Sequence, residues 1–212
     1  MKTKHLLMAV LALVLSGSTW AQSPIYLFPD YTPGTVVLKN RSVVNTAFNF
    51  DTFHDKLLYK DGDQIMELSD FSNVSSVLIG DRTFIPHGRA LYEVVSLEGA
   101  NLLIRWHQKK NPLGKKGAYD QVNPAANATS LDPNYYGNPL TARGGEEVFD
   151  LIIENSYAII KDGKFKKFTD RRSFLKIYSN EQDRINAYID QNHLLFTNPE
   201  DVIAIARYAA QL

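Results

Sequence analysis

The chain contains no cysteine in its 212 residues. It therefore has no disulfide, no thiolate nucleophile and no cysteine-ligated zinc or iron–sulfur centre. It also lacks a net charge, since 23 Lys and Arg residues balance 23 Asp and Glu residues. Nucleic-acid-binding domains usually carry a clustered basic surface, so this balance argues against DNA or RNA as a partner. Stability must come from an ordinary hydrophobic core.

Long apolar runs are also absent, with one exception at the N-terminus. The segment Leu6–Leu15 is uninterruptedly apolar, two lysines precede it and small residues follow it. This three-part layout predicts a cleaved secretory signal over residues 1–21, with cleavage between Ala21 and Gln22. The run is too short to span a bilayer, which takes about 20 residues.

An exported chain without cysteine has neither disulfide staples nor a cysteine-linked lipid anchor. Secreted eukaryotic domains often depend on disulfides, so we expect a protein of the bacterial envelope, in the periplasm or outside the cell. Loss of the signal would leave 21 basic and 23 acidic residues. No later segment reaches membrane-spanning length, which predicts a mature chain without a transmembrane segment.

Residues 22–109 alternate short segments rich in β-branched and aromatic residues with turn residues. Asn40–Ser42 and Asp61–Asp63 have the composition of hairpin turns. Turns spaced by roughly 8–12 residues are typical of an antiparallel meander, a sandwich or an open, barrel-like sheet. The region is therefore predicted to be a β-rich body.

Residues 110–145 have a different composition, rich in Asn, Pro, Gly and Ala. Structureless loops longer than about 15 residues are uncommon in compact domains and are usually functional or disordered. We predict a long flexible insertion here, with a binding loop as the alternative interpretation.

Residues 146–212 are predicted to complete the sheet and then form two to three short helices. Asp170 is a candidate N-cap for the first helix and Ser179 or Asn180 for the second. Asn198, followed by a proline, is the best-signalled N-cap, for a third helix. Strands followed by C-terminal helices predict an α+β fold.

The signatures of common hydrolases, metalloproteases and nucleotide-binding enzymes are missing from the sequence. The nearest approach to a catalytic or metal-binding cluster is Asp51, His54 and Asp55. Two carboxylates and an imidazole could bind a metal or act in acid–base chemistry, with Asp81 or His87 as a further group. The alternative is a polar connection between strands, in which the aspartates bond their own backbone.

Residues 161–176 form the most basic segment, with seven positive side chains against two negative ones. Phe165 and Phe168 alternate with these charges. Such a segment could contact lipid headgroups, an acidic polysaccharide or a protein. The alternative is a solvated hairpin that leads into a helix and buries its phenylalanines.

Three segments resemble uncharacterised exported proteins of Bacteroidota: Asn49–Tyr59, Val77–Ile85 and Lys161–Phe168. The resemblance extends over most of the chain after the signal. It implies export and a β-rich body with a helical end, and it implies no catalytic residue.

The sequence therefore favours an exported, non-enzymatic domain that binds an envelope protein or a surface ligand. Two alternatives remain: a small hydrolase or metal-dependent enzyme that uses Asp51, His54 and Asp55, and a structural envelope component. No catalytic residue, cofactor-binding residue or metal ligand is assigned, and no cofactor is expected.

Overall fold

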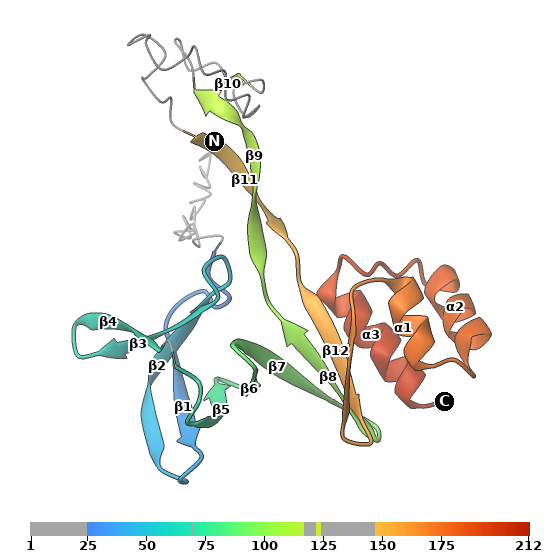
Figure 1. The fold of residues 1–212 in the computed structure, drawn as a ribbon, viewed down its shortest axis with the longest axis horizontal. Helices are drawn as coiled ribbons and strands as arrows, with labels where there is room; N and C mark the ends of the chain where they lie inside the picture. The colour runs from blue at the N-terminus through green and yellow to red at the C-terminus, as the bar shows by residue number, and fades with distance from the viewer. Residues whose placement is uncertain (1–24, 69, 117–121, 124–146) are drawn as a thin grey trace, which may run out of the picture.

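The structure is a computed structural model that describes residues 25–68, 70–116, 122–123 and 147–212. Ten strands form one open antiparallel sheet, and three short helices follow at the C-terminus (Figure 1). The predicted α+β fold with C-terminal helices is confirmed. The expected signal, residues 1–21, and residues 117–121 and 124–145 of the expected insertion lie outside the described residues.

The large sheet is close to a meander. Its strands lie in the order β13-β12-β8-β7-β6-β5-β1-β2-β3-β4, so that β1 is inserted between β2 and β5. In chain order they are β1 (Thr32–Leu38), β2 (Val43–Asp51), β3 (Lys56–Asp61), β4 (Gln64–Leu68), β5 (Val74–Ile79), β6 (Arg82–His87), β7 (Ala90–Leu97), β8 (Ala100–Arg105), β12 (Ser156–Lys161) and β13 (Lys164–Phe168). The three helices are α1 (Arg171–Ile177), α2 (Gln182–Gln191) and α3 (Pro199–Ala210).

The predicted hairpin turns at Asn40–Ser42 and Asp61–Asp63 are confirmed, because they join β1 to β2 and β3 to β4. Asn40 closes the turn from β1 to β2 by accepting a bond of 2.9 Å from the backbone nitrogen of Ser42. The turn from β12 to β13 has positive φ at both central residues, 52° at Asp162 and 69° at Gly163. Asp-Gly is the pair that tolerates this geometry, and its twist matches that of the flanking strands.

Three hydrophobic clusters stabilise the sheet, two large ones and a small one of Tyr92, Leu103 and Ala158. The helices cover β8, β12 and β13, where Tyr157, Phe174 and Ile205 are among the buried residues. The N-terminal strands pack around a second cluster that includes Phe48 and Val77 and has no helix over it. Figure 1 accordingly shows the helices beside β8 and β12, away from β1–β4.

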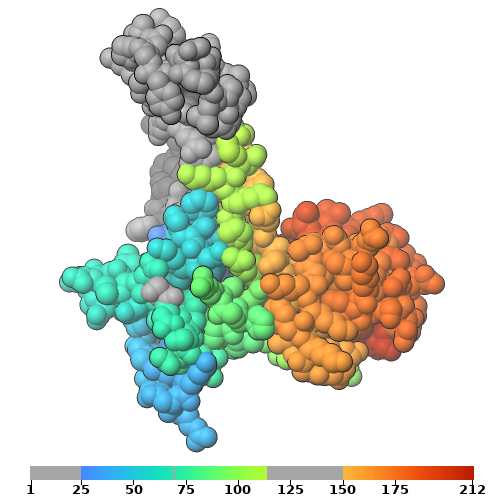
Figure 2. All heavy atoms as spheres, in the orientation of Figure 1, coloured from blue at the N-terminus to red at the C-terminus, as the bar shows by residue number. Residues whose placement is uncertain are grey.

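A two-stranded ribbon extends β8 and β12 beyond the sheet (Figures 1 and 2). We call it the arm. Its strands are β9 (Gln108–Lys116) and β11 (Glu147–Ile153), with the short β10 (Val122–Asn123) paired to β9. Residues 110–116, the first part of the segment expected to be an insertion, are paired as strand with β10 and β11. Their own composition disfavours a strand, and pairing with β11 imposes it.

Two of the predicted helix caps are confirmed. The Asp170 carboxylate accepts a bond of 2.7 Å from the backbone nitrogen of Ser173, whose hydroxyl accepts from the Asp170 backbone in return. Asn198 accepts from the backbone nitrogen of Glu200 at 3.2 Å, ahead of a proline at the first helical position. Both caps are local features, which is why the sequence reveals them.

The predicted cap of the second helix is wrong. Ser179 and Asn180 lie in the turn after α1, and the N-cap of α2 is Glu181, which makes no side-chain capping bond. The backbone nitrogen of Glu181 donates instead to the Tyr178 carbonyl at 3.0 Å, so the chain is still turning at these positions. None of the helices in the described part of the chain is long and apolar enough to cross a bilayer.

Candidate functional site

The turn between β2 and β3 brings Asp51 and His54 together. The His54 Nδ1 lies 2.7 Å from one Asp51 oxygen, and the other oxygen accepts from the backbone nitrogens of Phe53 and His54 at 3.0 and 2.8 Å. Asp51 is buried, whereas the His54 side chain is 52% exposed. The carboxylate therefore closes its own turn, as in the alternative interpretation of this segment.

Asp55 does not converge with Asp51 and His54. Its carboxylate lies 2.6 Å from Arg105 Nη2 and 3.3 Å from His107 Nδ1. His87, a further group considered from the sequence, stacks on Phe165 at a ring separation of 3.8 Å. Asp81 lies in the turn between β5 and β6.

Across the described ranges, no group of three His, Asp or Glu side chains is placed to hold a metal ion. The structure thus joins Asp51 to His54 and joins Asp55 to β8, without assembling the cluster that the enzymatic alternative requires.

The partners of Asp55 belong to the place where the arm leaves the sheet. We call residues 105–108 and 153–156 the arm root. Here the ladder between the strands is interrupted, and the backbone nitrogen of His107 donates to the Asn155 side-chain oxygen at 3.0 Å. The next backbone bond, from Glu154 to the His107 carbonyl, is 2.9 Å long. An amide side chain therefore takes the place of a backbone acceptor at this break.

The β2–β3 turn supports the arm root from one side. The backbone nitrogen of Gln108 donates to the Thr52 carbonyl at 2.9 Å, and Asp55 pairs with Arg105. Lys110 of the arm lies over the Phe53 ring, 5.9 Å from its centroid. The β2–β3 turn, which the sequence suggested as a catalytic or metal-binding cluster, thus supports the base of the arm.

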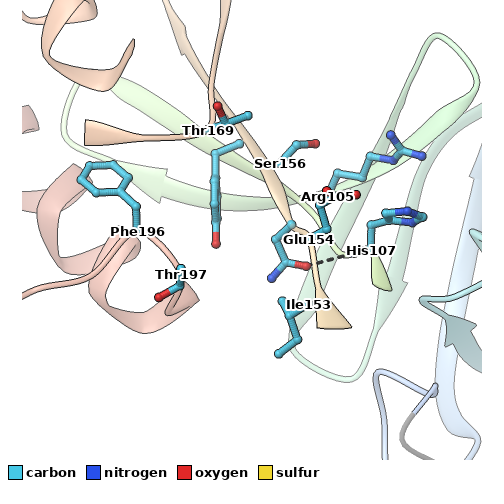
Figure 3. A pocket seen from close by; sticks show the side chains of 10 residues that line it. Arg105, His107, Ile153, Glu154, Ser156, Thr169, Phe196 and Thr197 are labelled. Atoms are coloured by element: carbon cyan, nitrogen blue, oxygen red, sulfur yellow. Dashed lines mark hydrogen bonds between the residues drawn. The ribbon is translucent and has the colours of Figure 1, made fainter. Parts of the chain in front are cut away.

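A cavity of about 610 Å³ lies beside the arm root. Figure 3 shows its walls, which come from the arm root, β12, the end of β13 and the segment that precedes α3. It is lined by Arg105, His107, Ile153, Glu154, Asn155, Ser156, Tyr157, Thr169, Phe196 and Thr197. Its volume falls within the range of small-molecule sites, roughly 300–1,000 Å³.

Polar and apolar groups both line the cavity, and its two fully charged side chains are paired with neighbours. The Arg105 and His107 side chains point away from Phe196 in Figure 3, and Arg105 is paired with Asp55. Glu154 is paired with Lys109 of the arm. Burial raises the pKa of the Tyr157 hydroxyl, and the neighbouring Asn155 side chain partly offsets this shift.

Sequence reasoning missed the residues that build this cavity. The available signal was the end of one apolar run at Arg105 and a polar interruption of another apolar run at Glu154–Asn155. The two breaks lie opposite each other because β8 pairs with β12 and β9 pairs with β11. The sequence does not show this pairing.

The basic segment 161–176 divides between two environments. Phe168 is buried beneath the helices, and Phe165 packs on the opposite face of the sheet against His87. Arg171 is held by Asp190 of α2 at 2.6 and 2.9 Å. Lysines alternate with these residues along β13, at one edge of the sheet, where charge opposes pairing with another strand.

No protein-family model matches the chain, and searches of curated proteins and of solved structures likewise gave no match.

Proposed function

We propose that the chain is an exported protein of the bacterial envelope that acts by binding a partner protein, with the arm as the contacting element. The observation that carries this proposal is the arm itself, which leaves the body of the protein in Figure 2. A two-stranded ribbon is at best marginally stable alone. Contact with a partner protein would therefore explain how the arm is stabilised.

The surface of the arm supports this assignment. Residues 109–113 of β9 are all exposed, and Leu113 is among them. On β11, Ile152 and Ile153 are also exposed. Exposed apolar side chains rimmed by polar residues can mark a protein contact surface.

The export part of the proposal is supported by the three-part N-terminal pattern at residues 1–21, with cleavage before Gln22. Production of the full chain in a bacterium, followed by mass determination of the exported product, tests it. A product that begins at Gln22 supports export with cleavage, and an unprocessed cytoplasmic chain contradicts it.

The binding part is tested by affinity capture from intact envelopes of the producing bacterium. The doubly substituted arm variant Leu113→Ser, Ile152→Ser should capture at least tenfold less of any specific partner than the unaltered protein. The control is Ile65→Ser, which removes an exposed apolar side chain from β4, outside the arm. Equal capture by all three proteins would contradict the proposal, and a partner that stays bound through purification would indicate a structural component.

A further inference from the structure

We propose that the edge of the sheet formed by β13, together with α1 beside it, binds the anionic surface of a lipid bilayer. This contact is separate from the arm and would stand if the arm had no partner. The inference rests on the charge of this edge relative to the rest of the chain, on the exposure of its cations and on their placement.

The positive charge of the chain is concentrated at this edge. Residues 161–176 carry seven basic and two acidic side chains, a net charge of +5. The chain from Gln22 onward has 21 basic and 23 acidic residues, a net charge of −2, so everything outside the segment has a net charge of −7. Such a separation of charge turns one side of a molecule toward an anionic surface and the remainder away from it.

Six of the seven cations are exposed and form no ion pair within the described part of the chain. Arg171 is the exception, because Asp190 of α2 holds it. Asp170 interacts electrostatically with two of the six without forming an ion pair. We call the six the basic edge: Lys161, Lys164, Lys166, Lys167, Arg172 and Lys176.

Two cations of the basic edge face each other across the β12–β13 ladder. Lys161 pairs with Lys164 beside the Asp-Gly turn. Like charges directly opposite each other in a sheet are destabilising. The Lys161 Nζ lies over the ring of Tyr178, 5.5 Å from its centroid, and so stays on the side of the sheet that the helices cover. Anionic headgroups outside the chain would relieve the repulsion between the two lysines.

The cations surround β13 instead of lining one face of it. Side chains alternate along a strand, so Lys164 and Lys166 share a face with Phe168, which is buried beneath the helices. Lys167 shares the opposite face with Phe165. From Lys164 to Lys167 the strand advances by about 10 Å, about one Debye length at 0.1 M salt. A flat anionic surface against this edge therefore attracts the cations of both faces at once, which favours a bilayer over a polymer held on one face.

The expected contact is with the lipid headgroups alone. Phe168 is buried and Phe165 stacks on His87, so the two phenylalanines of the segment are not free to enter the bilayer. The arm leaves the sheet at the other end of β12 from the β12–β13 turn (Figure 1). Binding through the basic edge would therefore leave the arm uncovered.

Vesicle binding tests the proposal directly. The full mature protein is mixed with vesicles of phosphatidylcholine that contain about one-third phosphatidylglycerol, or with vesicles of phosphatidylcholine alone, and the bound fraction is measured by cosedimentation. We expect saturable binding to the anionic vesicles only. Raising the salt from about 0.1 M to about 1 M should release the protein, because the Debye length falls from about 10 Å to about 3 Å.

Two other results would overturn the proposal. One is equal binding to both kinds of vesicle, or no binding to the anionic ones. The other is tighter binding to soluble polygalacturonate than to the anionic vesicles, which would assign the basic edge to an acidic polysaccharide.

Three variants locate the contact. The triple variant Lys164→Gln, Lys166→Gln, Lys167→Gln should bind anionic vesicles about 100-fold more weakly, because each lysine close to such a surface strengthens binding about fivefold. Arginine at the same three positions keeps the charge and should preserve binding. The matched control, Lys39→Gln, Arg41→Gln, Lys60→Gln, removes three exposed cations from the β1–β3 end of the sheet and should bind normally. Circular dichroism checks that each variant is folded.

Equal weakening by the triple variant and its control would show that only the net charge matters, and would overturn the assignment to the basic edge. The arm variant Leu113→Ser, Ile152→Ser should bind vesicles normally. Failure of this inference and failure of the proposed partner binding are therefore distinguishable.

Discussion

Two arginine–carboxylate pairs differ in what surrounds them. Arg82 pairs with Glu93 inside the sheet, and its guanidinium lies 5.1, 5.6 and 5.0 Å from the ring centroids of Phe28, Phe84 and Trp106. We call these five residues the Arg82 node. The second pair, Arg105 with Asp55, lies at the arm root beside an open cavity.

The Arg82 node connects the two halves of the core. Glu93 is 9% exposed, and its carboxylate accepts from Arg82 Nε at 2.8 Å and from the Trp106 indole nitrogen at 2.6 Å. Trp106 packs against both of the large hydrophobic clusters. Both oxygens of this buried carboxylate thus have partners, as a buried charge requires.

The pair at the arm root is satisfied less completely. One oxygen of Asp55 and the Nε of Arg105 have no hydrogen-bond partner in the described part of the chain. We therefore expect the enclosed pair to contribute more to the stability of the fold than the open pair. The first three predictions below test that difference, and the fourth tests a helix-to-helix ion pair.

The largest effect is expected from Arg82→Met. This substitution leaves Glu93 buried without its cation, and the free energy of unfolding should fall by about 3 kcal/mol. The measurement is urea unfolding followed by the fluorescence of Trp106, the one tryptophan of the chain from Gln22 onward. Adding Glu93→Gln should recover part of the loss, and a loss below about 1 kcal/mol would refute the structural role of the Arg82 node.

A smaller loss is expected from Trp106→Phe. The ring contacts are largely kept, while the indole donor to Glu93 is removed. A hydrogen bond to a charged group contributes about 1.5–3 kcal/mol, and we expect the lower end of that range. Unfolding is followed here by circular dichroism, because the fluorophore is lost. A neutral result would mean that Glu93 does not depend on this donor.

The matched substitution at the arm root, Arg105→Met, should cost about 1 kcal/mol or less. The side chains of Arg105 and Asp55 are 34% and 29% exposed, so solvent screens their attraction. Urea titration of this variant beside Arg82→Met compares the two pairs directly. Equal losses in the free energy of unfolding at the two arginines would contradict the proposed difference between the pairs.

The smallest effect is expected on acidification. The bond from Arg171 lowers the pKa of Asp190, and the backbone bond from Ser173 lowers the pKa of Asp170, both from 3.8. Their contribution to stability is therefore present above pH 3.8 and is lost as pH falls through the lowered values. Asp190→Asn should lose less stability than the unaltered protein between pH of about 5 and 2. An identical pH profile would show that the ion pair contributes nothing.

The sequence reveals the local parts of this structure. The hairpin turn at Asn40, the Asp-Gly turn and the caps at Asp170 and Asn198 each depend on residues within a few positions of one another. The failure at Ser179 and Asn180 has the same origin, because the end of α1 at Tyr178, and not the capping ability of these residues, decides where α2 begins.

The candidate site could not be predicted in this way because its contacts are non-local. Asp55 meets Arg105 at a sequence separation of 50 residues, and His107 meets Asn155 at a separation of 48. The insertion of β1 between β2 and β5 is equally invisible to local patterns. The sequence shows only that Asp51, His54 and Asp55 are polar. The fold shows that their turn contacts the arm root, through the bond from Arg105 to Asp55.

Site-specific photo-crosslinking tests most directly the claim that the arm is the contacting element. A photoreactive phenylalanine analogue replaces Leu113 on the arm in one strain of the producing bacterium and the exposed Thr83 on the sheet in another. Irradiation of intact cells should give a discrete crosslinked product from position 113 and none from position 83. No product from the arm, or the same products from both positions, would contradict the account.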